Sequence, residues 1–144
     1  MLKRLITFDL PPETRDAGLL ALRLTVGITL LLKHGLEKVE HFSAMAAHFP
    51  NPLHLGAAPS LVIALIGDFV CSILIVFGLA TRWAAAWAFL NIFVAWAFVH
   101  HFVFFGRAAD HGELIVLYLA AMLTLFLTGP GRYSVDATLR SPRP

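Results

Sequence analysis

The chain has little charge and almost no cysteine. Only 14% of its residues are charged and 58% are hydrophobic, whereas about 25% of the residues in a soluble globular domain are charged. This composition excludes an ordinary water-soluble domain and predicts a membrane protein. Cys71 is the single cysteine, which excludes an intramolecular disulfide and the dithiol relay of membrane thiol oxidoreductases. We expect a buried, inert thiol.

Several functional signatures are also missing. Lys3 and Arg4 are followed by only a short apolar run before Asp9, so no secretory signal is apparent. The net charge of +2 gives no reason to expect a nucleic-acid partner. The sequence has no flavin motif and no histidine pairs toward both faces of the kind that a diheme cytochrome needs. Any electrons must therefore come from a bound cofactor or from another subunit.

The hydrophobic residues form four blocks that are separated by charged residues, proline or glycine. With their flanking residues, these blocks approach or exceed the roughly 18 to 20 residues that span a bilayer. The sequence predicts a single all-α membrane domain over residues 1–144, an antiparallel bundle of four transmembrane helices. We expect these helices at about 14–39, 59–80, 83–106 and 111–129, followed by a tail over 130–144.

Lysine and arginine are distributed unevenly between the two sides of this bundle. One side carries Lys3, Arg4, Arg15, Arg82, Arg132, Arg140 and Arg143, and the other only Lys33, Lys38 and Arg107. Because basic residues favour the cytoplasmic side, both termini are predicted to be cytoplasmic. We expect a multi-pass protein of the bacterial inner membrane.

All histidines fall on the opposite, outward side. They are His34, His41, His48, His54, His100, His101 and His111. If the first helix continues past residue 34, then His34, Glu37, Lys38 and His41 share one of its faces. Val39, Phe42, Ala46 and Phe49 form a less polar face at helical spacing, which predicts a short interfacial helix over residues 39–49 in the first outer loop.

The second hairpin brings further polar residues to the same side. His100 and His101 end the third predicted helix, and His111 and Glu113 open the fourth. In an antiparallel bundle these groups would converge with those of the first hairpin, and the sequence does not say whether His100 or His101 points inward.

Three interpretations of this outward cluster remain open. The imidazoles and carboxylates can simply be solvated at helix ends. They can form a metal site of two or three histidines and a carboxylate. They can also bind the headgroup of a quinone, whose tail would need apolar walls. Phe89, Phe93 and Trp96 form an aromatic stripe that leads up to His100 and could supply such walls or simply pack the bundle.

Polar residues inside the hydrocarbon form a second candidate cluster. A charge at this depth is costly unless it is paired or hydrated. Arg23 and Asp68 are therefore predicted to pair, with Asn91 as a third member. The pair can be a structural clasp between helices or part of a ligand or proton site.

The spacing of these motifs resembles the DoxX family of membrane proteins over nearly the whole chain. The matching features, in order, are Arg23, the His34-Gly-Leu-Glu-Lys38 segment, the Gly78-Leu-Ala-Thr-Arg82 turn, a histidine that ends the third helix, Gly112-Glu113, and the Gly129-Pro-Gly-Arg-Tyr-Ser-Val-Asp136 block. The last block is the most specific. One departure is Asp68, at a position where the family usually has glutamate.

The resemblance implies a four-helix inner-membrane protein associated with thiosulfate:quinone-type oxidoreductases or with membrane redox-defence assemblies. Two functions remain open. The chain can be a membrane subunit of a quinone-linked oxidoreductase, which binds a quinone-like headgroup or a metal at the outward cluster. It can also be a non-catalytic scaffold that docks a protein partner or forms a homo-oligomer in the lipid, with Ala84 and Ala88 packing helices closely.

Overall fold

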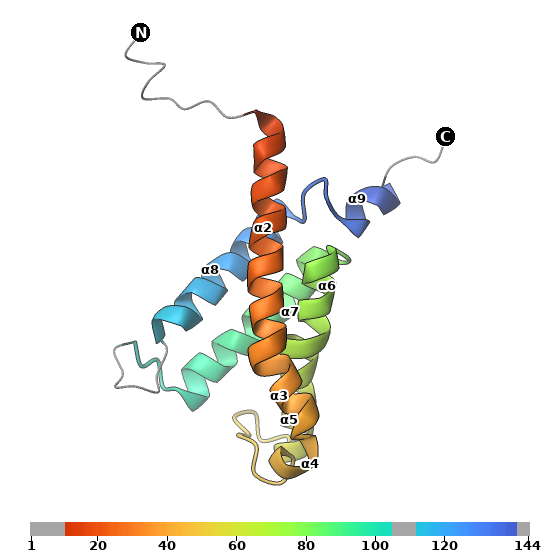
Figure 1. Ribbon diagram of the computed structural model, residues 1–144. Coiled ribbons are helices and arrows are strands. Elements are labelled where there is room, and N and C mark those ends of the chain that lie inside the picture. The colour runs from red at the N-terminus through yellow and green to blue at the C-terminus, as the bar shows by residue number, and fades with distance from the viewer. Residues whose placement is uncertain (1–10, 105–111, 141–144) are drawn as a thin grey trace.

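The structure is a computed structural model that describes residues 11–104 and 112–140, and all regular secondary structure within these ranges is helical (Figure 1). This confirms the predicted all-helical class. Three helical stretches are long and apolar enough to cross a membrane, namely Glu13–Glu40, Ala57–Phe77 and Thr81–Val99, and a fourth apolar helix, Gly112–Thr128, is shorter.

The first hairpin contains, in order, α2 (Pro12–Leu30), the π-helical turn η1 (Leu31–Gly35), α3 (Leu36–Glu40), α4 (Phe42–Met45), α5 (Ala57–Leu65), the π-helical turn η2 (Ile66–Val70) and α6 (Cys71–Phe77). The helix from α2 to α3 is continuous and begins with a proline in its first turn, where no amide hydrogen is needed. The short helix α4 lies within the 39–49 segment where a short helix was predicted. Gly78 ends α6 in the left-handed conformation.

The second hairpin contains α7 (Thr81–Val94), the π-helical turn η3 (Ala95–Val99) and α8 (Gly112–Thr128), and α9 (Val135–Arg140) follows it. The third helix ends at Val99 instead of continuing to the predicted residue 106. His101 and Phe102 have positive φ angles, which turn the chain. The ring of Phe102 then packs back on Trp96 at a centroid distance of 5.2 Å, so the apolar run after His100 folds onto the helix instead of extending it.

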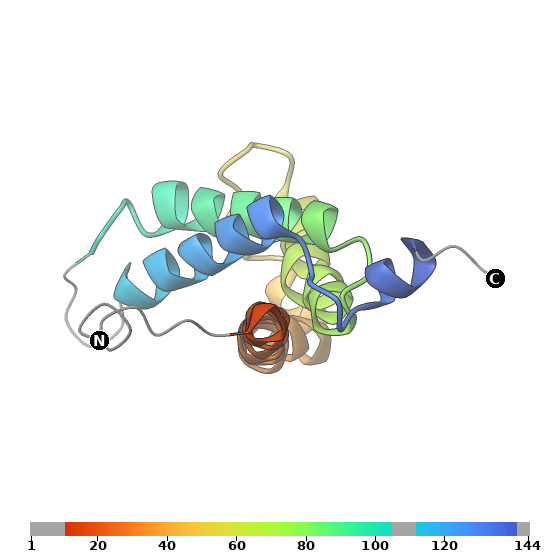
Figure 2. The same ribbon diagram turned by 90° about the horizontal axis from the view of Figure 1, so that it is seen from above.

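The two hairpins cross and then diverge (Figures 1 and 2). The α5 to α6 segment runs beside α2, and α7 runs beside α8. The start of α2, the α6–α7 turn and α9 share one end of the molecule, which we call the terminal end. The other end, with η1, α4 and the following loop, is the loop end. Helices therefore occur at all four predicted places, but three of them are long enough to cross a membrane, and the four do not lie side by side along their full length.

The core is centred where α7 packs on α8. Ala84, Ala85 and Ala88 are buried there against Met122 and Leu125. Small side chains let two helices approach closely, which is a common way to pack helices in membranes. The thiol of Cys71 belongs to this core and is buried, as predicted. The contact between α7 and α8 holds the second hairpin together. The end of this hairpin that is farthest from the α6–α7 turn diverges from α2.

Candidate functional site

A cavity of about 410 Å³ lies between the two hairpins at the loop end. Its lining comes from the helix that runs through η1, from α5 with η2, from α7 with η3, from the first two turns of α8, and from loop residues 49–53. Much of the lining is aliphatic, as at Leu30, Ile63 and Ile92. Both the volume and the apolar lining are typical of pockets that bind small molecules, which range from about 300 to 1,000 Å³.

All three π-helical turns of the described chain contribute to this cavity. His34 belongs to η1, Asp68 to η2, and Ala95 and Val99 to η3. A π-helical turn inserts one extra residue into a helix and re-aims the side chains around it, and such turns are frequent at functional sites. Three helices are therefore distorted around the same space.

A network of three side chains lies on the cavity wall, and we call it the Asp68 network. The Nζ atom of Lys38 is 2.8 Å from Oδ2 of Asp68. The amide Nδ2 of Asn91 donates a hydrogen bond of 2.8 Å to Oδ1 of the same carboxylate. The Lys38 and Asp68 side chains are only 12% and 9% exposed. Because both carboxylate oxygens have partners, the buried charge is compensated.

Lys38 also donates a hydrogen bond from Nζ to the backbone oxygen of His34, at 3.3 Å. An ammonium group has three N–H donors. Among the described residues, these contacts use two of them, so one N–H is available to an acceptor in the cavity.

Two glycines allow the helices that carry this network to approach each other. A Cβ atom on Gly35 would lie 2.7 Å from the backbone oxygen of Asp68, and one on Gly67 would lie 2.7 Å from the side-chain nitrogen of Asn91. Neither distance is possible for a real side chain without movement of its neighbour. The glycines therefore place η1 against η2, and η2 against α7.

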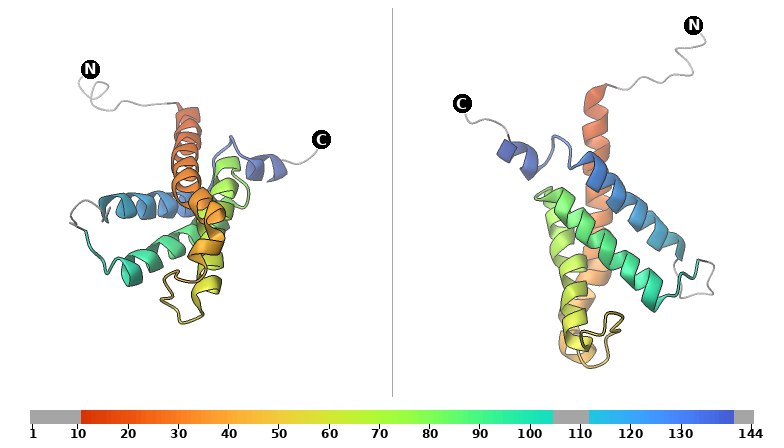
Figure 3. Two further views of the ribbon diagram at one scale, coloured as in Figure 1. Left: turned by 60° about the horizontal axis from the view of Figure 1, so that its bottom comes forward. Right: turned by 180° about the vertical axis from the view of Figure 1, so that it is seen from behind.

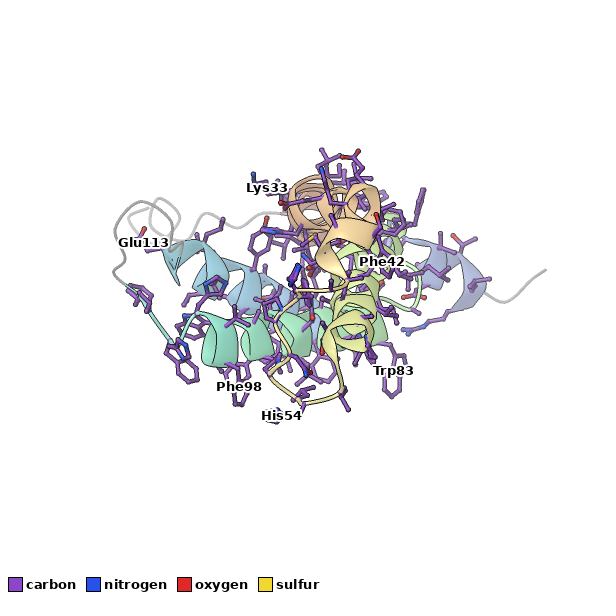
Figure 4. All side chains as sticks on the ribbon, turned by 90° about the horizontal axis from the view of Figure 1, so that it is seen from below. Lys33, Phe42, His54, Trp83, Phe98 and Glu113 are labelled. Atoms are coloured by element: carbon purple, nitrogen blue, oxygen red, sulfur yellow. The ribbon has the colours of Figure 1, made fainter. Side chains whose placement is uncertain are left out.

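Of the outward cluster predicted from the sequence, the structure brings His34 and His100 to the cavity. His101, which follows His100, is exposed, so His100 is the inward member of the pair. Glu37, His41 and Glu113 are also exposed and do not join the site. Figure 4 shows Glu113 at the outer start of α8 and His54 on the outside of the loop. His111 lies outside the described residues.

The metal interpretation and the aromatic walls are not supported in the form expected. Within residues 11–104 and 112–140, no group of three histidine, cysteine or acidic side chains is placed to hold a metal ion. Phe89 and Phe93 stack on each other at 6.3 Å and, like Trp96, do not line the cavity. The aromatic stripe instead packs α7 and the turn after it. Aliphatic residues, with Phe49 and Tyr118, line the pocket.

The predicted ion pair between Arg23 and Asp68 is wrong. Arg23 is fully buried near the terminal end. Its guanidinium donates hydrogen bonds to the backbone oxygens of Ile75 and Val76, each at 3.4 Å, and to that of Tyr133. The first two carbonyls lie in the last turn of α6, where the helix dipole favours a cation. Arg23 is thus a structural clasp, but its partners are backbone groups.

Asp136 completes this clasp at the start of the next helix. Its carboxylate accepts hydrogen bonds from the backbone N–H groups of Ala80 at 2.8 Å and Thr81 at 3.0 Å. Burial would raise the pKa of Asp136, but these hydrogen bonds outweigh it and hold the pKa below the ordinary value of 3.8. The terminal end therefore places a cation at the end of α6 and an anion at the start of α7, as the two helix dipoles require.

Sequence reasoning placed Lys38 on one helix face with His34 but did not predict that Lys38 pairs with Asp68. Two signals were available. Lys38 lies four residues after His34, on the same helix face. Asp68 also lies on the outward side of its helix centre and Arg23 on the inward side, at about 1.5 Å per residue, so Lys38 was the nearer cation.

Comparison with known proteins places this arrangement in a family. The sequence profile of the DoxX family matches residues 18–101, which include Lys38, Asp68 and Asn91, and the chain therefore belongs to the DoxX family. A Haemophilus influenzae protein described as uncharacterized is 27% identical over 114 residues, which cover 76% of this chain and 76% of the relative. No solved structure matches the chain.

Proposed function

We propose that this DoxX-family protein is a small membrane subunit of a quinone-linked oxidoreductase assembly, and that its loop-end cavity binds the quinone headgroup. One observation carries the proposal: an apolar cavity holds the Asp68 network on its wall, with His34 and His100 also in its lining. Apolar lining with a few placed polar groups suits a ring that is flat, apolar and edged by carbonyl oxygens.

Each polar group has a defined role in this proposal. The available N–H of Lys38 donates to one quinone carbonyl, and an imidazole of His34 or His100 donates to the other. Asp68 holds the ammonium group in place and is itself held by Asn91. An imidazole can act as a general acid and base, so it can also give or take the protons that accompany reduction of a quinone. The electrons come from a partner subunit, because the chain has no cysteine pair or flavin motif.

The orientation belongs to the same proposal. The charge distribution favours a cytoplasmic location for the terminal end, and both ends of the described chain lie at that end (Figure 1). In the bacterial inner membrane the cavity would then lie in the outer half of the bilayer.

The test is to purify the protein in mild detergent and to measure bound quinone after lipid extraction. We expect about one quinone per chain, and its loss in Lys38→Met and in His100→Asn. Two matched controls should keep it: Lys33→Met, an exposed lysine on the same helix, and His101→Asn, the exposed neighbour.

Retention of quinone by all four variants, or a wild-type protein without quinone, would contradict the proposal. A wild-type protein that carries no quinone but co-purifies with a soluble partner would instead support the scaffold function.

A further inference from the structure

We propose that the cavity opens sideways into the bilayer between α2 and α8, and that the ligand has a long apolar tail that leaves through this opening. The inference rests on the proposed function and deepens it. It names the ligand as a tailed amphiphile and gives the path of the tail.

The first observation is the divergence of α8 from α2. The hydroxyl of Tyr118 donates a hydrogen bond of 2.9 Å to Oγ1 of Thr29 and ties the two helices together. From this tie toward its first residue, Gly112, α8 runs away from α2 (Figures 1 and 3). The residues of α8 that line the cavity, Leu114, Ile115 and Tyr118, all lie in this diverging part or at the tie.

The second observation is the exposure of the lining at this place. Leu114 lines the cavity and is still 43% exposed. Thr29, on the other side of the tie, is also exposed. A side chain that belongs both to the cavity lining and to the outer surface marks the edge of an opening. Because Leu114 and Ile115 are hydrocarbon, this edge suits an acyl or isoprenoid chain and not an ion.

The third observation concerns the aqueous side, where the lining also reaches the surface, since Leu53 is 50% exposed. Phe49, Pro50, Pro52 and Leu53 form the lining at the loop. This loop is held in place by Asn51, whose Oδ1 accepts hydrogen bonds of 3.0 Å from the backbone N–H of Gly56 and from the hydroxyl of Ser60. Proline restricts the backbone further. The loop is thus a second edge of the cavity, but it faces water, where a long apolar tail is unfavourable, so we expect the tail to leave on the bilayer side.

The polar and apolar parts of the lining fix the direction of the ligand. The Asp68 network comes from α3, η2 and α7, whereas the exposed lining beside the Tyr118–Thr29 tie comes from the start of α8. A headgroup on the network would therefore point its tail toward Leu114.

Photo-crosslinking tests this path directly. The full chain in lipid nanodiscs is incubated with a decyl-substituted benzoquinone that carries a diazirine on its tail, and the labelled peptides are identified by mass spectrometry. We expect label on α8 near Leu114 and on α2 near Leu30. An excess of unlabelled decyl-substituted quinone should abolish it. Label on residues 49–53 would overturn the proposed path.

A pair of tryptophan substitutions provides the second measurement. Leu114→Trp fills the opening, whereas Leu117→Trp lies one turn along α8 at an exposed position outside the cavity lining. We expect Leu114→Trp to weaken binding of the decyl quinone about tenfold, the effect of removing about two methylene groups from apolar contact. The same ring with a methyl group in place of the tail should bind both variants equally.

The two proposals fail in different ways. If the wild-type protein binds neither quinone, the proposed function is wrong. If it binds the decyl quinone and Leu114→Trp does not alter that affinity, the function stands and the sideways opening is wrong.

Discussion

The two ends of this molecule use charged side chains in different ways. At the terminal end, Arg23 and Asp136 are bonded to backbone groups at the end of α6 and at the start of α7. At the loop end, Lys38 and Asp68 are bonded to each other beside a cavity. The charges at the terminal end bond to the backbone of the fold, although Nε of Arg23 has no hydrogen-bond partner among the described residues. The charges at the loop end lie on the wall of a cavity that a ligand can enter.

The helices at the two ends also differ in how regular they are. All π-helical turns of the described chain lie at the loop end, and the turns near the terminal end are ordinary α-helix closed by Gly78 and Gly129 in left-handed conformations. Distorted helices lower the stability of a fold, and such distortions are frequent at functional sites. On the function proposed above, the terminal end stabilises the fold and the loop end binds the ligand.

The largest effect should follow from Arg23→Met. The substitution leaves the carbonyls of Ile75, Val76 and Tyr133 without their buried donor. We expect a loss of about 3 kcal/mol in the free energy of unfolding, because a buried acceptor left without a donor costs about 1–3 kcal/mol. The carbonyl of Ile75 keeps the backbone N–H of Gly78 as a second donor. Thermal unfolding in detergent measures it, with the exposed Arg15→Met as control. Equal stability of the two variants would show that Arg23 is not a clasp.

A smaller effect is expected from Gly35→Ala. Its new Cβ would meet the backbone of η2 at 2.7 Å, and backbone atoms cannot move aside as a flexible side chain can. We expect a loss of about 1–3 kcal/mol in stability, as for other overpacked sites, together with weaker quinone binding. Gly18→Ala on the same helix has open space around it and should be neutral or slightly stabilising. The contact between η1 and η2 is unimportant if both variants behave alike.

The smallest effect concerns Asp136 and depends on pH. The pKa of Asp136 is lower in the folded chain than the ordinary 3.8. Its charged form therefore stabilises the fold fully above about pH 4, and this stabilisation is lost as the pH falls through the lowered pKa. Asp136→Ala should cost about 1 kcal/mol at neutral pH, the usual loss of a helix cap. The difference from wild type should shrink on acidification below about pH 4. A difference that is constant with pH would contradict this assignment.

Much of the fold could be predicted from the sequence, because hydrophobic blocks and their breaks report helices directly. The helix that begins near residue 12, the short helix after residue 40 and the buried Cys71 follow from such patterns. The end of the third helix at Val99 does not, because the apolar run continues and only the packing of Phe102 on Trp96 turns the chain back.

The site was harder to predict than the fold. His34 and His100 were among the candidates, but which of two adjacent histidines faces inward depends on the left-handed turn at His101. The partner of Asp68 depends on the depth of each helix and on the close approach that Gly35 allows. The role of Asp136 depends on a contact with residues more than fifty positions earlier. Hydrophobic periodicity carries none of this information.

The most direct test of the division between the two ends is the double variant Lys38→Met/Asp68→Asn, measured for both thermal stability and bound quinone. The double change removes both charges and leaves neither one unpaired, so the fold itself should lose little. We predict a variant that unfolds near the wild-type temperature and retains no quinone. A variant that unfolds as readily as Arg23→Met, or one that retains quinone, would contradict the account.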